Sequence, residues 1–231
     1  MKSFENGLNV SGYGEKRRGL SVNQLKWIAL ITMTIDHLAA YGFVIPVFNT
    51  YYDYLRIIGR IAAPLFFFVL TESIRHTRSK AKLLLRLYLG AVGVGLFVAV
   101  TNLFFHDTIG RFSQSNILFD YVYTTIYILL IEQIFEGIKQ KRWSRGGLAF
   151  LGILATCIPH YIGVWLLEFP YAKFHLAPET VWTIQDFVGS FVRSPLQAEY
   201  TILFILMGIL MYFAGNKFGK AAVIYSVRYA M

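Results

Sequence analysis

Six long apolar runs constrain the fold of this chain more than any other feature of its sequence. They cover residues 25–45, 57–74, 83–105, 117–138, 146–169 and 199–214, and a seventh begins near Ala221. About 20 apolar residues cross the hydrocarbon core of a bilayer. Backbone groups in lipid must be hydrogen-bonded within their own segment, and these runs are too long for barrel strands. We therefore predict an all-α, polytopic transmembrane helical bundle with about six to seven spanning helices.

The composition agrees with a membrane location, and nothing divides the chain into separate units. Hydrophobic residues make up 56% of the sequence and charged residues only 15%, unlike an ordinary soluble domain. Residues 1–20 are rich in Gly, Ser and charge, so we expect a flexible cytoplasmic tail before a single transmembrane helical domain of residues 21–231. Residues 181–192 are too short to span, and we expect a connector or a lid that lies on the membrane surface or dips into it.

The net charge of +9 is concentrated in every second connection between apolar runs. The clusters are Lys16, Arg17, Arg18 and Lys26; Arg75, Arg78, Lys80, Lys82 and Arg86; Lys139, Lys141, Arg142 and Arg145; and Lys217 with Lys220. By the positive-inside rule, this alternation places the N-terminus in the cytoplasm. We expect the lipid bilayer, and no nucleic acid, as the partner of these charges. The single Cys157 excludes an internal disulfide and a Cys-based metal cluster, and we expect no metal.

Asp36 and His37 lie together inside the first apolar run. A charged side chain at the bilayer centre costs roughly 2.5–3.5 kcal/mol on insertion scales, so such groups face a bundle interior, water or a partner. In an antiparallel hairpin of the first two runs, Arg60 comes within reach of Asp36, whereas His37 lies about 100° around the helix and faces elsewhere. Histidine exchanges protons near neutral pH, which suits a general base. The alternative is a buried ion pair that fixes helix packing.

Other polar residues predict a site at each side of the membrane. Asn116 and Asp120 open the fourth run and His160 interrupts the fifth, so with Arg60 they could line an externally open cavity. Glu72 lies beside the basic connection, where it could contact a nucleotide-like cofactor or form an interfacial ion pair with Arg75 or Lys26.

Two stretches of the sequence resemble the TraX family of multispanning bacterial membrane proteins. They are residues 25–37, LKWIALITMTIDH, and residues 55–66, LRIIGRIAAPLF. Residues 116–119, NILF, resemble the later asparagine motif of the family, and Glu72, His76, Thr77 and Arg86 extend the likeness. Asp36 and His37 match the family's Asp-His pair, Arg56, Gly59 and Arg60 its arginine motif, and Asn116 its asparagine.

The resemblance implies an integral membrane acyltransferase of the bacterial inner membrane, with a fold related to other membrane acyltransferases. The namesake of the family N-acetylates the conjugative pilin subunit, so acetyl-CoA is the expected donor and a pilin-like peptide N-terminus, a glycan or a lipid the acceptor. From the positions of the polar residues described above and from the resemblance together, we assign the residues to three groups. They are the catalytic Asp36, His37 and Arg60; the substrate-binding Arg56, Asn116, Asp120 and His160; and the cofactor-binding Glu72, Arg75, Arg78 and Arg86.

Two other functions fit the same residues. Asp36, His37 and Arg60 could form the titrating relay of a proton-coupled membrane carrier. A homodimer would then compensate for the small number of helices. A non-catalytic membrane scaffold is the third alternative.

Overall fold

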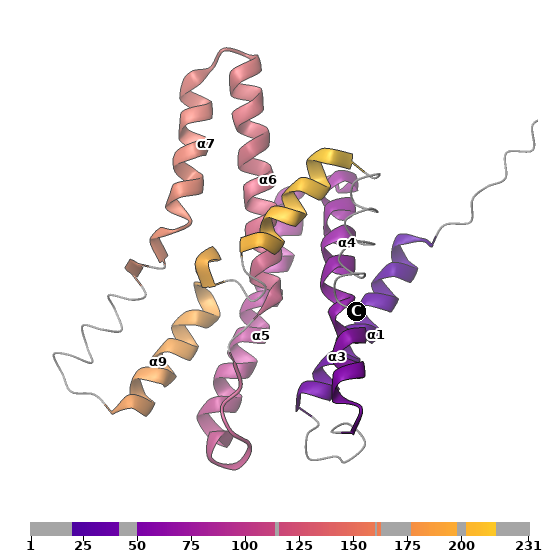
Figure 1. Ribbon diagram of the computed structural model, residues 1–231. Helices are drawn as coiled ribbons and strands as arrows, with labels where there is room; N and C mark the ends of the chain where they lie inside the picture. The colour runs from indigo at the N-terminus through magenta and orange to yellow at the C-terminus, as the bar shows by residue number, and fades with distance from the viewer. Residues whose placement is uncertain are drawn as a thin grey trace, which may run out of the picture.

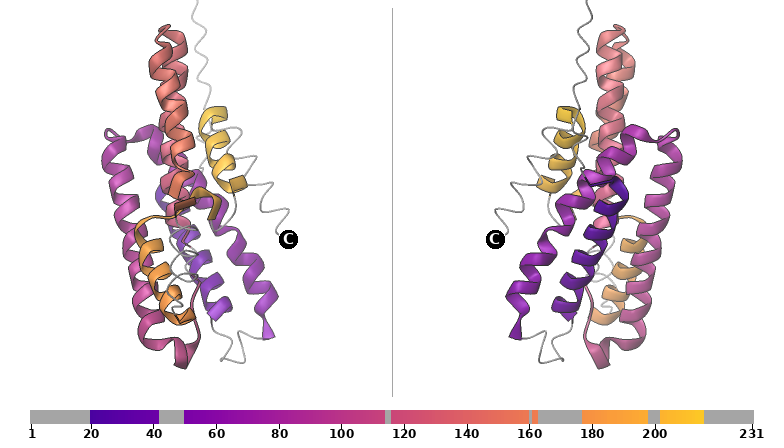
Figure 2. Two further views of the ribbon diagram at one scale, coloured as in Figure 1. Left: turned by 90° about the vertical axis from the view of Figure 1, so that its left-hand side faces the viewer. Right: turned by 90° about the vertical axis from the view of Figure 1, so that its right-hand side faces the viewer.

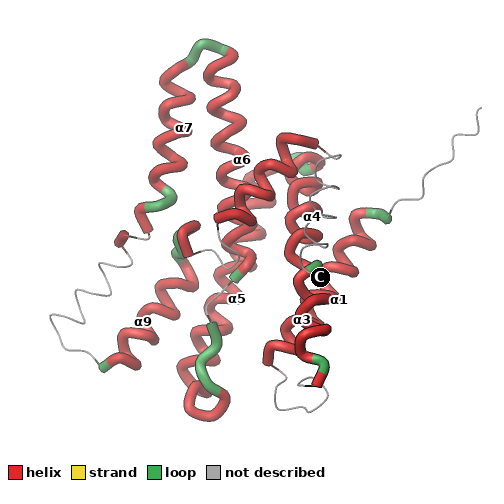
Figure 3. The backbone as a smooth tube through the Cα atoms, in the orientation of Figure 1, coloured by secondary structure: helices red, strands yellow, loops and turns green. Residues whose placement is uncertain are grey.

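The computed structural model describes residues 20–41, 50–113, 116–159, 161–162, 177–197 and 202–215. Every regular element within these ranges is helical, and none of them is a strand (Figures 1 and 3). The predicted all-helical class is therefore confirmed for the described part of the chain.

The first helices form an antiparallel hairpin. Helix α1 (Val22–Tyr41) packs against α3 (Tyr52–Arg60) and α4 (Ala62–His76), which follow each other with a break only at Ile61 (Figure 1). Pro64 is the third residue of α4. Its missing N–H therefore falls in the first turn, where backbone amides have no intrahelical partner.

The longest helices are α5 (Lys80–Ile109) and α6 (Ile117–Lys139), which pack against each other. Ser79 begins α5 by accepting a hydrogen bond from the Lys82 backbone N–H at 3.3 Å. Helix α6 forms a second hairpin with α7 (Trp143–Ala155). This hairpin rises beyond the other helices (Figure 2). We call the side of the bundle where α4 ends and α5 begins the basic end, because Arg75, Arg78 and Lys80 lie there.

The last described part of the chain is built from two short helices. Helix α9 (Pro178–Phe191) runs lengthwise beside α5 (Figures 1 and 2), followed by the turn η1 (Pro195–Gln197) and the helix Ile202–Gly215. An added Cβ on Gly95 of α5 would lie 2.8 Å from Ser190 Cα of α9, so the glycine permits this close approach. The segment predicted as a connector or lid is therefore a helix packed along the bundle.

Within the described ranges, three helical stretches are long and apolar enough to cross a membrane: Tyr52–His76, Lys80–His106 and Ile117–Lys139. The six to seven predicted spans include runs that lie partly outside these ranges, such as residues 146–169. The helix Ile202–Gly215 is apolar but shorter, and α7 has only 13 residues. Helix α1 has 20 residues, but the polar Lys26, Asp36 and His37 lower its hydropathy. The core lies between α4, α6 and the helix Ile202–Gly215 and contains Phe67, Leu70, Ile74, Tyr121, Ile128 and Met211.

Candidate functional site: an intramembrane pocket beside His37

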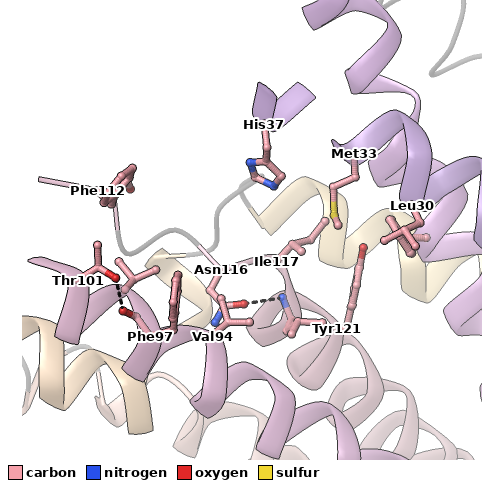
Figure 4. Close-up of a pocket in the computed structure, with 14 residues that line it drawn as sticks. Leu30, Met33, His37, Val94, Phe97, Thr101, Phe112, Asn116, Ile117 and Tyr121 are labelled. Atoms are coloured by element: carbon pink, nitrogen blue, oxygen red, sulfur yellow. Dashed lines mark hydrogen bonds between the residues drawn. The ribbon is translucent and has the colours of Figure 1, made fainter. Parts of the chain in front are cut away.

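A pocket of about 680 Å³ lies between α1 and α5 (Figure 4). Its volume falls within the usual range of small-molecule sites, about 300–1,000 Å³. The walls are Leu30, Met33 and His37 of α1 and Val94, Phe97, Val98 and Thr101 of α5, and the remaining lining includes Phe66, Phe112, Ser113, Asn116, Ile117, Leu118 and Tyr121. Most of these side chains are apolar, so His37 is the strongest candidate for chemistry in the pocket.

Asn116 lines the pocket, but its amide is committed to the backbone. Its Oδ1 accepts a hydrogen bond from the Leu118 N–H at 3.1 Å, and its Nδ2 donates to the Ala91 carbonyl at 2.8 Å. The first bond caps α6 and the second ties α6 to α5. Thr101 is committed in the same way, because its hydroxyl donates to the Phe97 carbonyl at 2.8 Å. Asn116, which was predicted to bind substrate, therefore shapes the pocket wall.

Asp36 lies on a different face of α1 and forms an ion pair with α3. Its Oδ2 is 2.8 Å from Nη1 of Arg56, and its Oδ1 is buried without a hydrogen-bond partner among the described residues. The sequence predicted Arg60 as the partner, and this pairing was wrong by one helical turn. Both arginines lie at similar depths, so depth alone does not choose between them.

Gly59 explains why Arg56 is the partner. A Cβ added at Gly59 would lie within 2.5 Å of Asp36 Cγ, so the Asp36 side chain rests directly on the backbone of α3 at this glycine. Arg56 lies one turn before Gly59 on a neighbouring part of the same face, about 60° away, whereas Arg60 is rotated about 100° from it. Arg60 is exposed as a result.

Of the described polar residues predicted at the outer side, Asn116 lines the described pocket and Asp120 and Arg60 do not. Asp120 is only 1% exposed, in the first turn of α6, where its carbonyl accepts a hydrogen bond from the Thr124 hydroxyl. It does not line the described pocket, and neither do Arg56 and Arg60. His160 lies outside the described residues. Among the predicted site residues, the pocket brings together His37 and Asn116.

At the basic end, Glu72 and Arg75 hold helices together. Arg75 Nη1 lies 2.6 Å from Glu72 Oε1, and Arg75 Nη2 donates to the carbonyls of Met211, at 2.7 Å, and Tyr212. Arg75 thus binds backbone carbonyls near the end of the helix Ile202–Gly215. The alternative of an ion pair between Glu72 and Arg75 is confirmed. Of the four residues predicted to bind a cofactor, Arg78 and Arg86 have exposed side chains.

A neighbouring network that sequence reasoning missed joins α5, α6 and the helix Ile202–Gly215. Lys80 Nζ lies 2.5 Å from Glu132 Oε2, and the Tyr212 hydroxyl donates to Glu132 Oε1 at 2.5 Å. The Lys80 ammonium also lies 6.0 Å from the centre of the Tyr212 ring. The signal for this network in the sequence is Glu132, an acidic residue near the end of an apolar run.

A second missed network fastens α9 to the far end of α5. Asp186 Oδ2 accepts hydrogen bonds from Asn102 Nδ2 at 2.9 Å and from Arg111 Nη2 at 2.5 Å. The Arg111 guanidinium also lies 5.3 Å from the Trp182 ring centre. A lone acidic residue within the apolar segment 181–192 was the available signal. Among the described residues, no three His, Cys, Asp or Glu side chains come together as metal ligands would.

The fold is that of a helical membrane protein, with helices long and apolar enough to span a bilayer and a mostly apolar pocket among the described residues. Its sequence matches the family model described as TraX protein over residues 21–218, which is most of the chain. The protein therefore belongs to the TraX family, and the resemblance predicted from its motifs is confirmed. No curated protein and no solved structure matches the chain.

Proposed function

We propose that the protein is an integral membrane acyltransferase of the bacterial inner membrane, with its N-terminus in the cytoplasm. It moves an acetyl group from cytoplasmic acetyl-CoA to an amine or hydroxyl of a membrane or extracytoplasmic acceptor, which is a pilin-like peptide, a glycan or a lipid. The observation that carries the proposal is the imidazole of His37 in the wall of an apolar pocket within a helical bundle (Figure 4). Membership of the TraX family supports it.

His37 acts as the general base in this proposal. The neutral imidazole takes the proton from the acceptor N–H or O–H while the acceptor atom forms a bond to the thioester carbonyl carbon. The C–S bond of acetyl-CoA then breaks, and the CoA thiolate receives the proton from the imidazolium. The products are the acetylated acceptor and free CoA, and His37 returns to its neutral form.

The ion pair of Asp36 and Arg56 positions His37 rather than taking part in bond making. It fixes the rotation of α1 against α3, and His37 follows Asp36 on the same helix. The proposal assigns no chemical step to Arg60, because its exposed side chain lies outside the described pocket lining. Residues that hold a general base in place contribute through geometry, since small misplacements of reacting groups cost rate.

The donor binds at the basic end, where exposed cations can meet its phosphates. Arg78 and Arg86 are exposed there, whereas Arg75 and Glu72 are committed to each other and to the helix Ile202–Gly215. Arginine is well suited to phosphate because its planar fork donates two parallel hydrogen bonds. We therefore assign donor phosphate binding to Arg78 and Arg86.

Calorimetric titration of the purified protein with acetyl-CoA tests this assignment. Binding should weaken at least about tenfold when Arg78 and Arg86 are both replaced by Gln, since each charged hydrogen bond contributes about 1.5–3 kcal/mol. It should persist in His37→Ala, because that side chain acts on the acceptor. A folded wild-type protein that binds no acetyl-CoA would refute the proposed donor.

A proton-coupled carrier is a second candidate, because the ion pair of Asp36 and Arg56 lies next to His37 along α1. Ionisable residues within membrane helices often mark proton pathways. Proton flux into liposomes that His37→Ala abolishes would support the carrier. Absence of flux in protein that transfers acetyl groups would exclude it.

A further inference from the structure

The pocket beside His37 has a polar end and an apolar end. Along α1, Leu30 and His37 are separated by a rise of about 10 Å, and Val94 and Thr101 of α5 by the same rise. Because α1 and α5 both run away from the basic end (Figure 1), His37 and Thr101 lie toward one end of the pocket and Leu30 and Val94 toward the other. Asn116 lies near Val94, because its Nδ2 donates to the Ala91 carbonyl, but both of its amide atoms are committed to the backbone. The Thr101 hydroxyl is likewise bonded to the Phe97 carbonyl, so the imidazole of His37 marks the polar end of a mostly apolar pocket.

The pocket as a whole is larger than an acetyl group requires. Phe66, Ile117 and Tyr121 from α4 and α6 line it together with the two walls. The total volume is about 680 Å³, whereas an acetyl group contains only two carbon atoms. A pocket of this size and lining accommodates a long hydrocarbon chain.

The pocket has an exposed apolar rim between α1 and α5. Phe97 is 72% exposed and Leu30 is 41% exposed although both line the pocket, so they form its rim. The neighbouring exposed residues of α5, Leu103 and Phe104, are also apolar. A ligand that enters here comes from the hydrocarbon region rather than from water.

We propose that this pocket binds the aliphatic chain of a bilayer lipid that bears a hydroxyl or an amine, and that this lipid is the acyl acceptor. The inference rests on the proposed function and names its substrate class. Lipid tails and apolar side chains are equally apolar, so a chain gains little by leaving the bilayer for the pocket. The polar end selects lipids with a hydroxyl or an amine, because that group meets His37 there. It loses its proton to the imidazole and becomes an ester or amide as CoA leaves.

A photoactivatable long-chain primary alcohol, with a diazirine near the end of its chain, tests the proposal in proteoliposomes. In the wild type, the diazirine should label residues of the apolar end, such as Phe66, Val94 and Tyr121, when the digested protein is mapped by mass spectrometry. Labelling spread evenly over the lipid-facing helices would overturn the proposal, and this readout does not depend on the folding of any variant.

Matched variants on α5 separate the pocket from the outer surface. Val94→Trp fills the pocket and should lower labelling about tenfold or more, because the indole takes the volume of the chain. Leu103→Trp, on the same helix and outside the described lining, should leave labelling unchanged. Equal labelling of the two variants would overturn the proposal.

Two further arms identify the source of the chain and separate this inference from the proposed function. Palmitoyl-CoA that displaces the probe, where hexadecanol does not, would show that the pocket holds the acyl chain of a donor and would overturn the acceptor assignment. His37→Ala should keep the labelling and lose acetyl transfer to the alcohol. Labelling without any transfer by the wild type would refute the acceptor role, whereas transfer to a soluble amine without pocket labelling would refute this inference alone.

Discussion

Gly59→Ala tests the closest described contact between α1 and α3. The new methyl group would lie within 2.5 Å of Asp36 Cγ and closer still to Asp36 Cβ. The Cβ atom is fixed to the backbone, so rotation of the carboxylate cannot relieve the overlap. The two helices must move apart, and the ion pair between Asp36 and Arg56 must lengthen or break.

The expected magnitude follows from two opposing effects. Overpacking of a close-packed contact costs about 1–3 kcal/mol. Alanine within a helix is favoured over glycine by roughly 0.5–1 kcal/mol. Because the overlap involves an atom that cannot rotate away, we expect a cost near the upper limit and a net loss of about 2 kcal/mol. For a chain of this size, that loss lowers Tm by about 4–8 °C.

Thermal unfolding in detergent, followed by the loss of monodisperse protein, measures this effect. Gly93→Ala on α5 is the matched control, because a Cβ at Gly93 would meet nothing within 4 Å. The control should be unchanged or slightly more stable. A Gly59→Ala variant as stable as the control would refute the contact and, with it, the explanation of why Arg56 rather than Arg60 pairs with Asp36.

Three further variants test other contacts. Arg56→Gln leaves the Asp36 carboxylate without its ion pair and should cost about 1–3 kcal/mol of stability; adding Asp36→Asn should recover much of it, and additive losses would contradict the pairing. Asp186→Asn should speed hydrogen exchange across α9 while α1 stays unchanged, because Arg111 then loses its charged partner; unchanged exchange in α9 would contradict the role of the network. Arg75→Gln should lower Tm by about 2–8 °C and leave acetyl-CoA binding intact; lost binding in folded protein would show that Arg75 holds the donor.

The helical class, and the presence of candidate site residues in the first hairpin, could be predicted from the sequence because both follow from local patterns. Long apolar runs determine the helices, and ionisable residues inside one of them stand out at once. The N-cap role of Asn116 was also accessible, since Asn directly before an apolar run is a common helix start. Asn116 was assigned to substrate binding instead, because it matches an asparagine motif of the family.

The partners of the polar residues could not be predicted from the sequence, because they depend on helix rotation and on long-range packing. Two arginines one turn apart, Arg56 and Arg60, lie within reach of Asp36. The contact of Asp36 with Gly59 determines that the ion pair forms with Arg56. Asp186 meets Asn102 of α5 across a sequence separation of 84 residues. The packing of α9 along α5 could not be predicted for a similar reason, because an apolar segment too short to span does not show which helix it packs against.

Transfer of radiolabelled acetyl from acetyl-CoA into acceptors in membranes that contain the protein tests the central claim most directly. Wild type should be compared with His37→Ala and with Leu38→Ala, whose side chain is exposed and lies outside the described pocket lining. The account predicts label transfer by the wild type and by Leu38→Ala, and a decrease of about 10²–10⁴-fold in His37→Ala, the usual contribution of a general base. Full transfer by a folded His37→Ala variant would contradict it.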